Sequence, residues 1–224
     1  MVDHIGVNSD KMILSWRVII IGSIIITLIA YLCPIIEQYE WDIDYTIPAP
    51  SVSVMFFFFI VVILNTFLYR FARRYSLDSN ELMLIYAMTM VGAPLCSFGL
   101  VQFLIPNMVG PIHFATEENM WQEDFLRYIP NWFGPRDKNV IDGFYTGGFD
   151  SVPWRVWIKP FLIWCIFALA FYFVLLCISA IIRKQWVERE RLTFRILETP
   201  LAMAEEPERN LVLNRFFRNK MTWI

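Results

Sequence analysis

The sequence predicts an all-α, polytopic membrane protein with four transmembrane helices, a long aromatic extracytoplasmic loop and a cytoplasmic C-terminal helical arm. The first observation behind this prediction is the presence of four apolar stretches, each long enough to cross a bilayer. The second is composition, since 57% of the residues are hydrophobic and 18% are charged. Soluble domains carry roughly 25% charged residues. The formal net charge of −2 gives no indication of a nucleic-acid partner.

The strongest of the four stretches is the last, which predicts a span over about residues 156–183. Residues 160–182 contain no charged side chain, and Arg183 and Lys184 follow directly. A helix of this length crosses a hydrocarbon core of about 30 Å. Its apolar residues cover every face, which argues against a helix on the surface of a soluble protein.

The first two spans are predicted at about residues 16–36 and 52–70. Pro34 is expected to kink or end the first of them. The four consecutive phenylalanines at 56–59 cover all sides of the second helix, so contact with lipid is their expected role. Asn65 is the strongest polar group in that span and is expected to make an interhelical hydrogen bond.

The third span, at about residues 82–105, differs because glycine, proline and small polar residues interrupt it. Such breaks free backbone groups, which a membrane tolerates only where protein or water satisfies them. Broken helices of this kind line substrate sites in transporters. The alternative is a proline-kinked helix whose small residues pack against a neighbour. The candidate substrate-pathway residues are Gly92, Pro94, Ser97, Gly99 and Gln102.

No catalytic residue, metal site or cofactor is predicted, so the chain is not expected to be an enzyme. Four acid-base residues of the extracytoplasmic loop, which spans residues 106–155, do not form a metal-binding motif such as HExxH. They are His113, Glu117, Glu118 and Asp124. The four cysteines stand in apolar runs without metal-ligand spacing, so small buried hydrophobic residues are their expected role.

The distribution of basic residues predicts the orientation. Arginines and lysines flank the spans mainly at the ends that the two termini share, which predicts a multi-pass protein of the cell inner (plasma) membrane with both termini in the cytoplasm. The predicted organisation is a polar tail (1–11), a four-helix transmembrane domain (12–184) and a cytoplasmic or interfacial helical arm (185–224). Within the arm, a new helix is expected to start at Thr199 and Pro200.

Several segments of the second half of the chain together resemble a known family. They are residues 114–121, 129–132, 143–147, 152–157, 185–194 and 219–224. They resemble an uncharacterised bacterial, planctomycete-type family of multi-span membrane proteins that is distantly similar to oligopeptide transporters. One departure is Arg195, where the family usually has a proline. The resemblance implies that this chain is the N-terminal part of a longer carrier.

The functional expectation is therefore the N-terminal part of a secondary transporter for small peptides or metal chelates. The alternative is a non-catalytic integral membrane subunit or scaffold of a larger complex. The expected partners are the lipid bilayer and either the remaining helices of a longer chain or partner subunits, with a homo-oligomer also possible. Proton coupling usually needs a buried carboxylate or histidine. None is expected inside a span of this chain, so such a group is expected outside it.

Overall fold

The computed structural model describes residues 15–39, 45–46, 51–96, 100–147, 151–190, 194–205 and 215–219. Within these residues the secondary structure is entirely helical. The longer helices are α1 (Trp16–Tyr39), α2 (Val52–Phe71), α3 (Ser79–Cys96), α4 (Val101–His113) and α7 (Trp154–Lys184). The shorter ones are η1 (Arg73–Tyr75), α5 (Trp121–Asp124), η2 (Leu126–Tyr128), α6 (Lys138–Thr146), η3 (Gln185–Arg189), α8 (Arg195–Ala204) and α9 (Arg215–Arg218).

Four helical stretches of the described chain are long and apolar enough to cross a membrane, which suggests a multi-pass membrane protein. They are Trp16–Tyr39, Val52–Phe71, Ser79–His113 and Trp154–Arg189. The third comprises α3 and α4, and residues 97–99 between them lie outside the described part. The prediction of an all-α chain with four such helices is confirmed.

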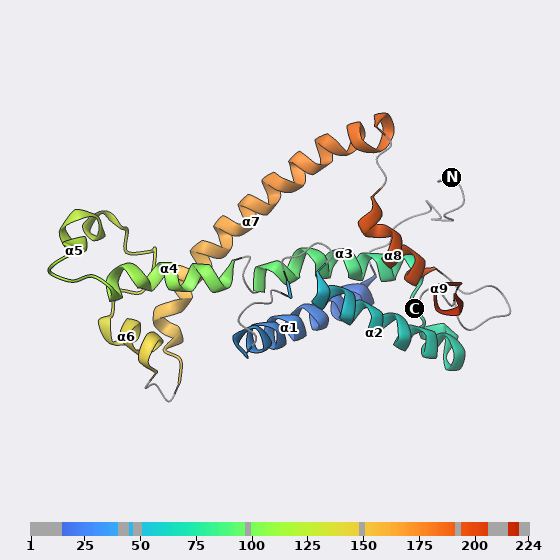
Figure 1. The fold of residues 1–224 in the computed structure, drawn as a ribbon, viewed down its shortest axis with the longest axis horizontal. Helices are drawn as coiled ribbons and strands as arrows, with labels where there is room; N and C mark the ends of the chain where they lie inside the picture. Colours follow the sequence, from blue (N-terminus) through green and yellow to red (C-terminus); the bar gives the residue numbers. More distant parts are fainter. Residues whose placement is uncertain are drawn as a thin grey trace. The chain divides into compact units, whose positions relative to one another are not determined.

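The chain forms two compact units, one of residues 1–102 with 194–224 and the other of residues 103–193. In the first unit α1, α2 and α3 lie side by side (Figure 1). Gly22 of α1 lies against Met88 of α3, where an added Cβ would meet the methionine Cε at 3.0 Å. Gly22 was expected as a small residue that could face a neighbouring helix, and this contact places it at a helix–helix interface.

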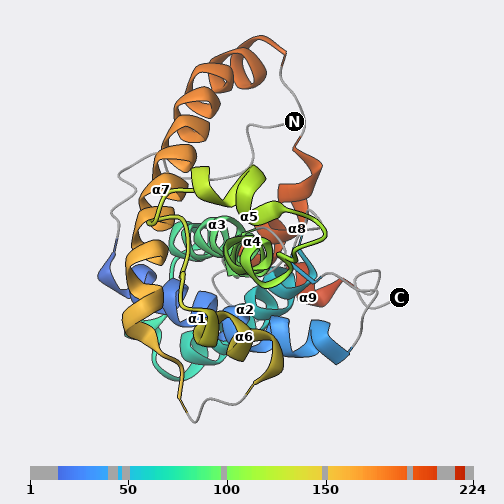
Figure 2. The ribbon, with the colours of Figure 1, turned by 90° about the vertical axis from the view of Figure 1, so that its left-hand side faces the viewer.

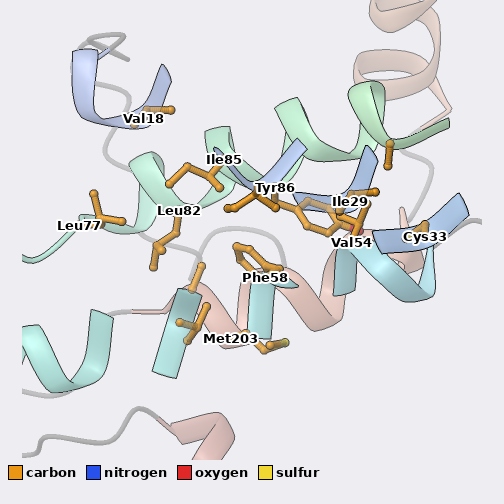
Figure 3. Close-up of a cluster of buried hydrophobic side chains, with 14 residues drawn as sticks. Val18, Ile29, Cys33, Val54, Phe58, Leu77, Leu82, Ile85, Tyr86 and Met203 are labelled. Atoms are coloured by element: carbon orange, nitrogen blue, oxygen red, sulfur yellow. The ribbon is translucent and has the colours of Figure 1, made fainter. Parts of the chain in front are cut away.

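The core of the first unit is apolar and draws on four helices. Phe58 of α2 lies against Tyr86 of α3 with ring centroids 5.1 Å apart, and Met203 of α8 joins the same cluster (Figure 3). The expectation that all four phenylalanines face lipid is wrong for Phe58, which is 1% exposed. Phe56, at 59% exposed, is available to lipid. The two residues differ because only one face of α2 is turned toward α3.

Polar contacts define one end of this unit. Arg17, at the start of α1, donates to Glu81 Oε2 at 2.9 Å and to the Ser76 carbonyl at 3.0 Å. Asn65 of α2 was expected to bond another helix, but it bonds the backbone before α3 instead. Its Nδ2 donates to the Leu77 carbonyl at 3.0 Å and its Oδ1 accepts from the Leu77 amide at 2.7 Å. The starts of α1 and α3 therefore lie at the same end of the unit.

Two prolines lie inside helices. Pro34 was expected either to kink or to end the first span, and α1 continues through it to Tyr39, because a proline in the last turns removes only one hydrogen bond. Helix α8 starts at Arg195 and contains Pro200, so Thr199 is not its first cap. Pro200 is the sixth residue of α8, where the missing amide removes one helix hydrogen bond, and it is buried.

In the second unit, the segment that the sequence identified as a loop is folded onto α7. Met108, Val109 and Ile141 form a buried cluster against which Trp157 and Trp164 of α7 pack. The Trp164 Nε1 donates to the Phe133 carbonyl at 3.0 Å. Helix α6 lies beside the first turns of α7 (Figures 1 and 2). Aromatic side chains thus fix this segment to the start of α7.

Replacing Asn65 by alanine is expected to destabilise the protein by roughly 1–3 kcal/mol, because both backbone groups of Leu77 lose their side-chain partner. Thermal unfolding in detergent, followed by circular dichroism, measures the change. The matched control is Thr66→Ala, whose hydroxyl bonds only the Val62 carbonyl of its own helix. Equal effects of the two substitutions would contradict the role assigned to Asn65.

Candidate functional site

Three of the five predicted pathway residues lie in the described part of the chain, namely Gly92, Pro94 and Gln102. Gly92 packs against Ile26 of α1, where an added Cβ would lie 2.7 Å from the isoleucine Cδ1. Pro94 lies inside α3 and is half-buried, and Gln102 in the first turn of α4 is exposed. Ser97 and Gly99 lie outside the described residues. The contact of Gly92 is the helix-packing arrangement that the sequence left as the alternative, and a pathway role stays a prediction.

A polar cluster at the end of the first unit opposite Arg17 was missed by sequence reasoning. Glu37, in the last turns of α1, is 5% exposed, and its Oε1 accepts the Tyr45 amide at 3.2 Å. The Ser51 hydroxyl donates to the Tyr45 carbonyl at 2.8 Å and lies 3.0 Å from the Ser53 hydroxyl. Thr46 is buried beside them. Four polar side chains are therefore buried where α1 ends and α2 begins.

Glu37 is a buried carboxylate in the last turn of α1, directly after the charge-free part of this candidate span. The sequence reading ended the first span at residue 36 and placed Glu37 in the following loop. The spacing could have indicated that Glu37 is buried. The buried residues of α1 follow each other three or four positions apart, and Glu37 continues that stripe. The stripe consists of Val18, Gly22, Ile25, Ile29, Cys33 and Glu37.

The core of the first unit also contains an unpaired hydroxyl. Tyr86 is 2% exposed, and its Oη is buried without a hydrogen-bond partner in the described part of the chain. Thr89, one turn later on α3, instead bonds the Ile85 and Tyr86 carbonyls of its own helix at 2.9 Å. Buried polar groups are nearly always paired, so the Tyr86 hydroxyl is an exception in the described part of the chain.

In the second unit, His113 at the end of α4 has a partner that the sequence did not indicate. Its Nδ1 lies 2.9 Å from Asp142 Oδ1 of α6, and its ring stacks on Tyr145 with centroids 4.2 Å apart. The expected neighbours Glu117, Glu118 and Asp124 do not join it in a metal-binding group, and no group of three or more potential ligands occurs among the residues described. Helix α6 was not predicted, which is why Asp142 was missed.

The second unit also contains an apolar cleft of about 480 Å³. Three helices line it: α4 through Ile105, α6, and the first turns of α7. The side chains on α7 include Trp154, Trp157, Ile158 and Leu162. This volume is within the range of roughly 300–1,000 Å³ that small-molecule sites occupy.

Gly92→Ala tests whether packing against α1 explains this glycine. The new methyl group meets Ile26, so the substitution is expected to destabilise the protein by roughly 1–2 kcal/mol. In an Ile26→Ala background the space is open, and the same substitution is expected to be neutral or stabilising by up to about 1 kcal/mol through helix propensity. Thermal unfolding of the four proteins of this cycle measures both values. An unchanged cost in both backgrounds would show that another contact requires Gly92.

Comparison with known proteins places the chain in a family. No curated protein and no solved structure matches it. A family model matches residues 8–224, which is nearly the whole chain, and the match shows no link to transporters. The chain therefore belongs to a family described as "Family of unknown function (DUF6785)".

Proposed function

We propose that this chain is the N-terminal part of a secondary carrier in the bacterial inner membrane that moves small peptides or metal chelates with protons. The observation that carries the proposal is the buried carboxylate of Glu37 in α1, a helix long and apolar enough to span the membrane. Ionisable side chains buried in membrane helices are costly and usually mark ion pathways or proton relays.

Glu37 is buried among polar groups at the end of α1. The ionised carboxylate only accepts hydrogen bonds, and one of them comes from the Tyr45 amide. The Ser51 and Ser53 hydroxyls are buried in the same cluster, and Ser51 donates to the Tyr45 carbonyl. Through Tyr45, Glu37 therefore connects the end of α1 to the start of α2, and a change at its carboxylate would alter that connection.

Contacts inside the first unit support the proposed orientation, with both termini cytoplasmic. Arg17 reaches the segment before α3, which follows the basic residues Arg73 and Arg74. Ser79, at the start of α3, donates from its hydroxyl to the Ala204 carbonyl of α8. The C-terminal end of α8 thus lies at the same end of this unit as Arg17. An even number of crossings, four in this proposal, returns the chain to that end.

A second candidate, an integral membrane subunit or scaffold, is favoured by α7. The most apolar window of the stretch Trp154–Arg189 has no residue buried within the structure. A helix this apolar needs lipid, further helices of a longer chain or a partner subunit around it. Isolation of the protein from native membranes in a stable complex, without substrate transport by that complex, would favour this candidate over a carrier.

The carrier proposal predicts that Glu37→Gln abolishes proton-driven uptake. The substitution keeps the shape of the side chain but removes its ability to release a proton. The complete carrier that contains this chain is reconstituted in proteoliposomes with labelled di- and tripeptides or an iron chelate, with and without an inward proton gradient. The gradient-driven rate is expected to fall roughly a hundredfold, as when a positioned proton-transfer group is removed.

The matched control is Glu118→Gln, which removes an exposed carboxylate and should leave uptake unchanged. Absence of uptake by the unsubstituted carrier for every peptide and chelate, at any gradient, would contradict the proposed function. Gradient-driven uptake that survives in Glu37→Gln would leave a carrier but exclude Glu37 as its proton-binding group.

A further inference from the structure

With α7 placed across a bilayer, the apolar cleft of the second unit would extend from the level of the lipid headgroups to that of the acyl chains. Residues 160–182 of α7 are free of charge and extend about 34 Å at 1.5 Å per residue, which matches a hydrocarbon core of about 30 Å. With α7 placed across a bilayer in this way, residues 154–159 would lie at the level of the lipid headgroups, and Phe161 and Leu162 at the level of the acyl chains. The lining of the cleft includes residues from both levels.

Two basic side chains flank this cleft on α7. Arg155 and Lys159 are four positions apart, so they lie on one side of the helix, next to the face that carries Ile158 and Leu162. Both are exposed, and neither forms an ion pair with the residues that the structure describes. They also oppose the charge bias of the chain, because basic residues are otherwise depleted at extracytoplasmic span ends.

Aromatic residues complete the arrangement. Trp154 and Trp157 both line the cleft at the headgroup level, where the amphipathic indole ring is most favourable. Deeper in the cleft the lining is aliphatic or phenyl, with Ile105, Phe161 and Leu162. Along α7, cationic and amphipathic side chains therefore come first, and purely apolar side chains follow. This is the order of polarity along a phospholipid from its phosphate to its acyl chain.

We propose that the cleft is a binding site for an anionic phospholipid of the surrounding bilayer. One acyl chain occupies the cleft between α6 and the start of α7, and the phosphate lies between Arg155 and Lys159. The proposal concerns a different site from Glu37 and holds whether or not the protein is a carrier. A bound lipid here would fix α6 against α7 and cover apolar surface that the chain itself leaves open.

Photolabelling tests this site directly. The chain is placed in phosphatidylcholine nanodiscs that contain either phosphatidylglycerol or phosphatidylcholine with a photoreactive group on the acyl chain. After irradiation, the labelled peptides are mapped by mass spectrometry. Label from phosphatidylglycerol is expected to concentrate on residues 140–147 and 152–162, and label from phosphatidylcholine is expected to be weak and spread along α7.

Charge removal provides the decisive comparison. In the double variant Arg155→Gln with Lys159→Gln, the mole fraction of phosphatidylglycerol needed for half-maximal labelling is expected to rise roughly tenfold. The charge-conserving variant Arg155→Lys with Lys159→Arg should label like the unsubstituted chain, which shows that the site itself is intact. The matched control Arg127→Gln with Lys138→Gln removes two exposed charges of the same unit outside the cleft and should have no effect.

Three results would overturn the proposal. The first is uniform labelling of α7 by phosphatidylglycerol, without enrichment at the cleft. The second is equal labelling by the two lipids. The third is an equal loss of labelling in the control variant Arg127→Gln with Lys138→Gln. That result would show that the net charge of the unit, and not the cleft, attracts the lipid. Size-exclusion profiles and helical circular dichroism of each variant confirm that folded proteins are compared.

Discussion

A polypeptide backbone inside a bilayer finds no water, and this constraint determines most of what the chain can be. Each amide and carbonyl must be bonded within the protein, so the crossing segments are helices. Four stretches, α1, α2, α3 with α4, and α7, are helical. Each is also long and apolar enough to cross a membrane. In the described part of the chain, two polar side chains also supply bonds to backbone groups just outside the helices. Asn65 bonds the backbone of Leu77, and Glu37 accepts the Tyr45 amide.

The contacts that hold the first unit together depend on small residues as much as on large ones. Lipid is as apolar as leucine, so close packing rather than escape from water brings membrane helices together. Gly22 admits Met88 and Gly92 admits Ile26, which brings α1 and α3 into contact at two levels. Phe58, Tyr86 and Met203 then fill the space between α1, α2, α3 and α8. Two polar groups are buried inside this apolar packing, the Glu37 carboxylate and the Tyr86 hydroxyl.

Hydropathy and length were sufficient to predict the spans, because they depend on composition averaged over some twenty residues. Single contacts were not predictable in this way. Phe58 is buried and Phe56 is not, although both belong to the same run, because the orientation of α2 is set by its neighbours. Glu37 could have been found from the spacing of the buried stripe on α1, had that stripe been followed past Pro34. The pairing of His113 with Asp142 needed helix α6, whose short and mixed sequence carries a weak helical signal. The cleft depends on the meeting of three helices, which no local pattern encodes.

The central claim is that the chain crosses the membrane four times with its basic ends in the cytoplasm, and cysteine accessibility in intact cells tests it most directly. In a background where the four native cysteines are alanine, Arg74→Cys, Arg189→Cys and Glu118→Cys are each treated with an impermeant maleimide before and after lysis. The account predicts that only position 118 reacts in intact cells and that positions 74 and 189 react after lysis. Labelling of positions 74 and 189 from opposite sides of the membrane would contradict it.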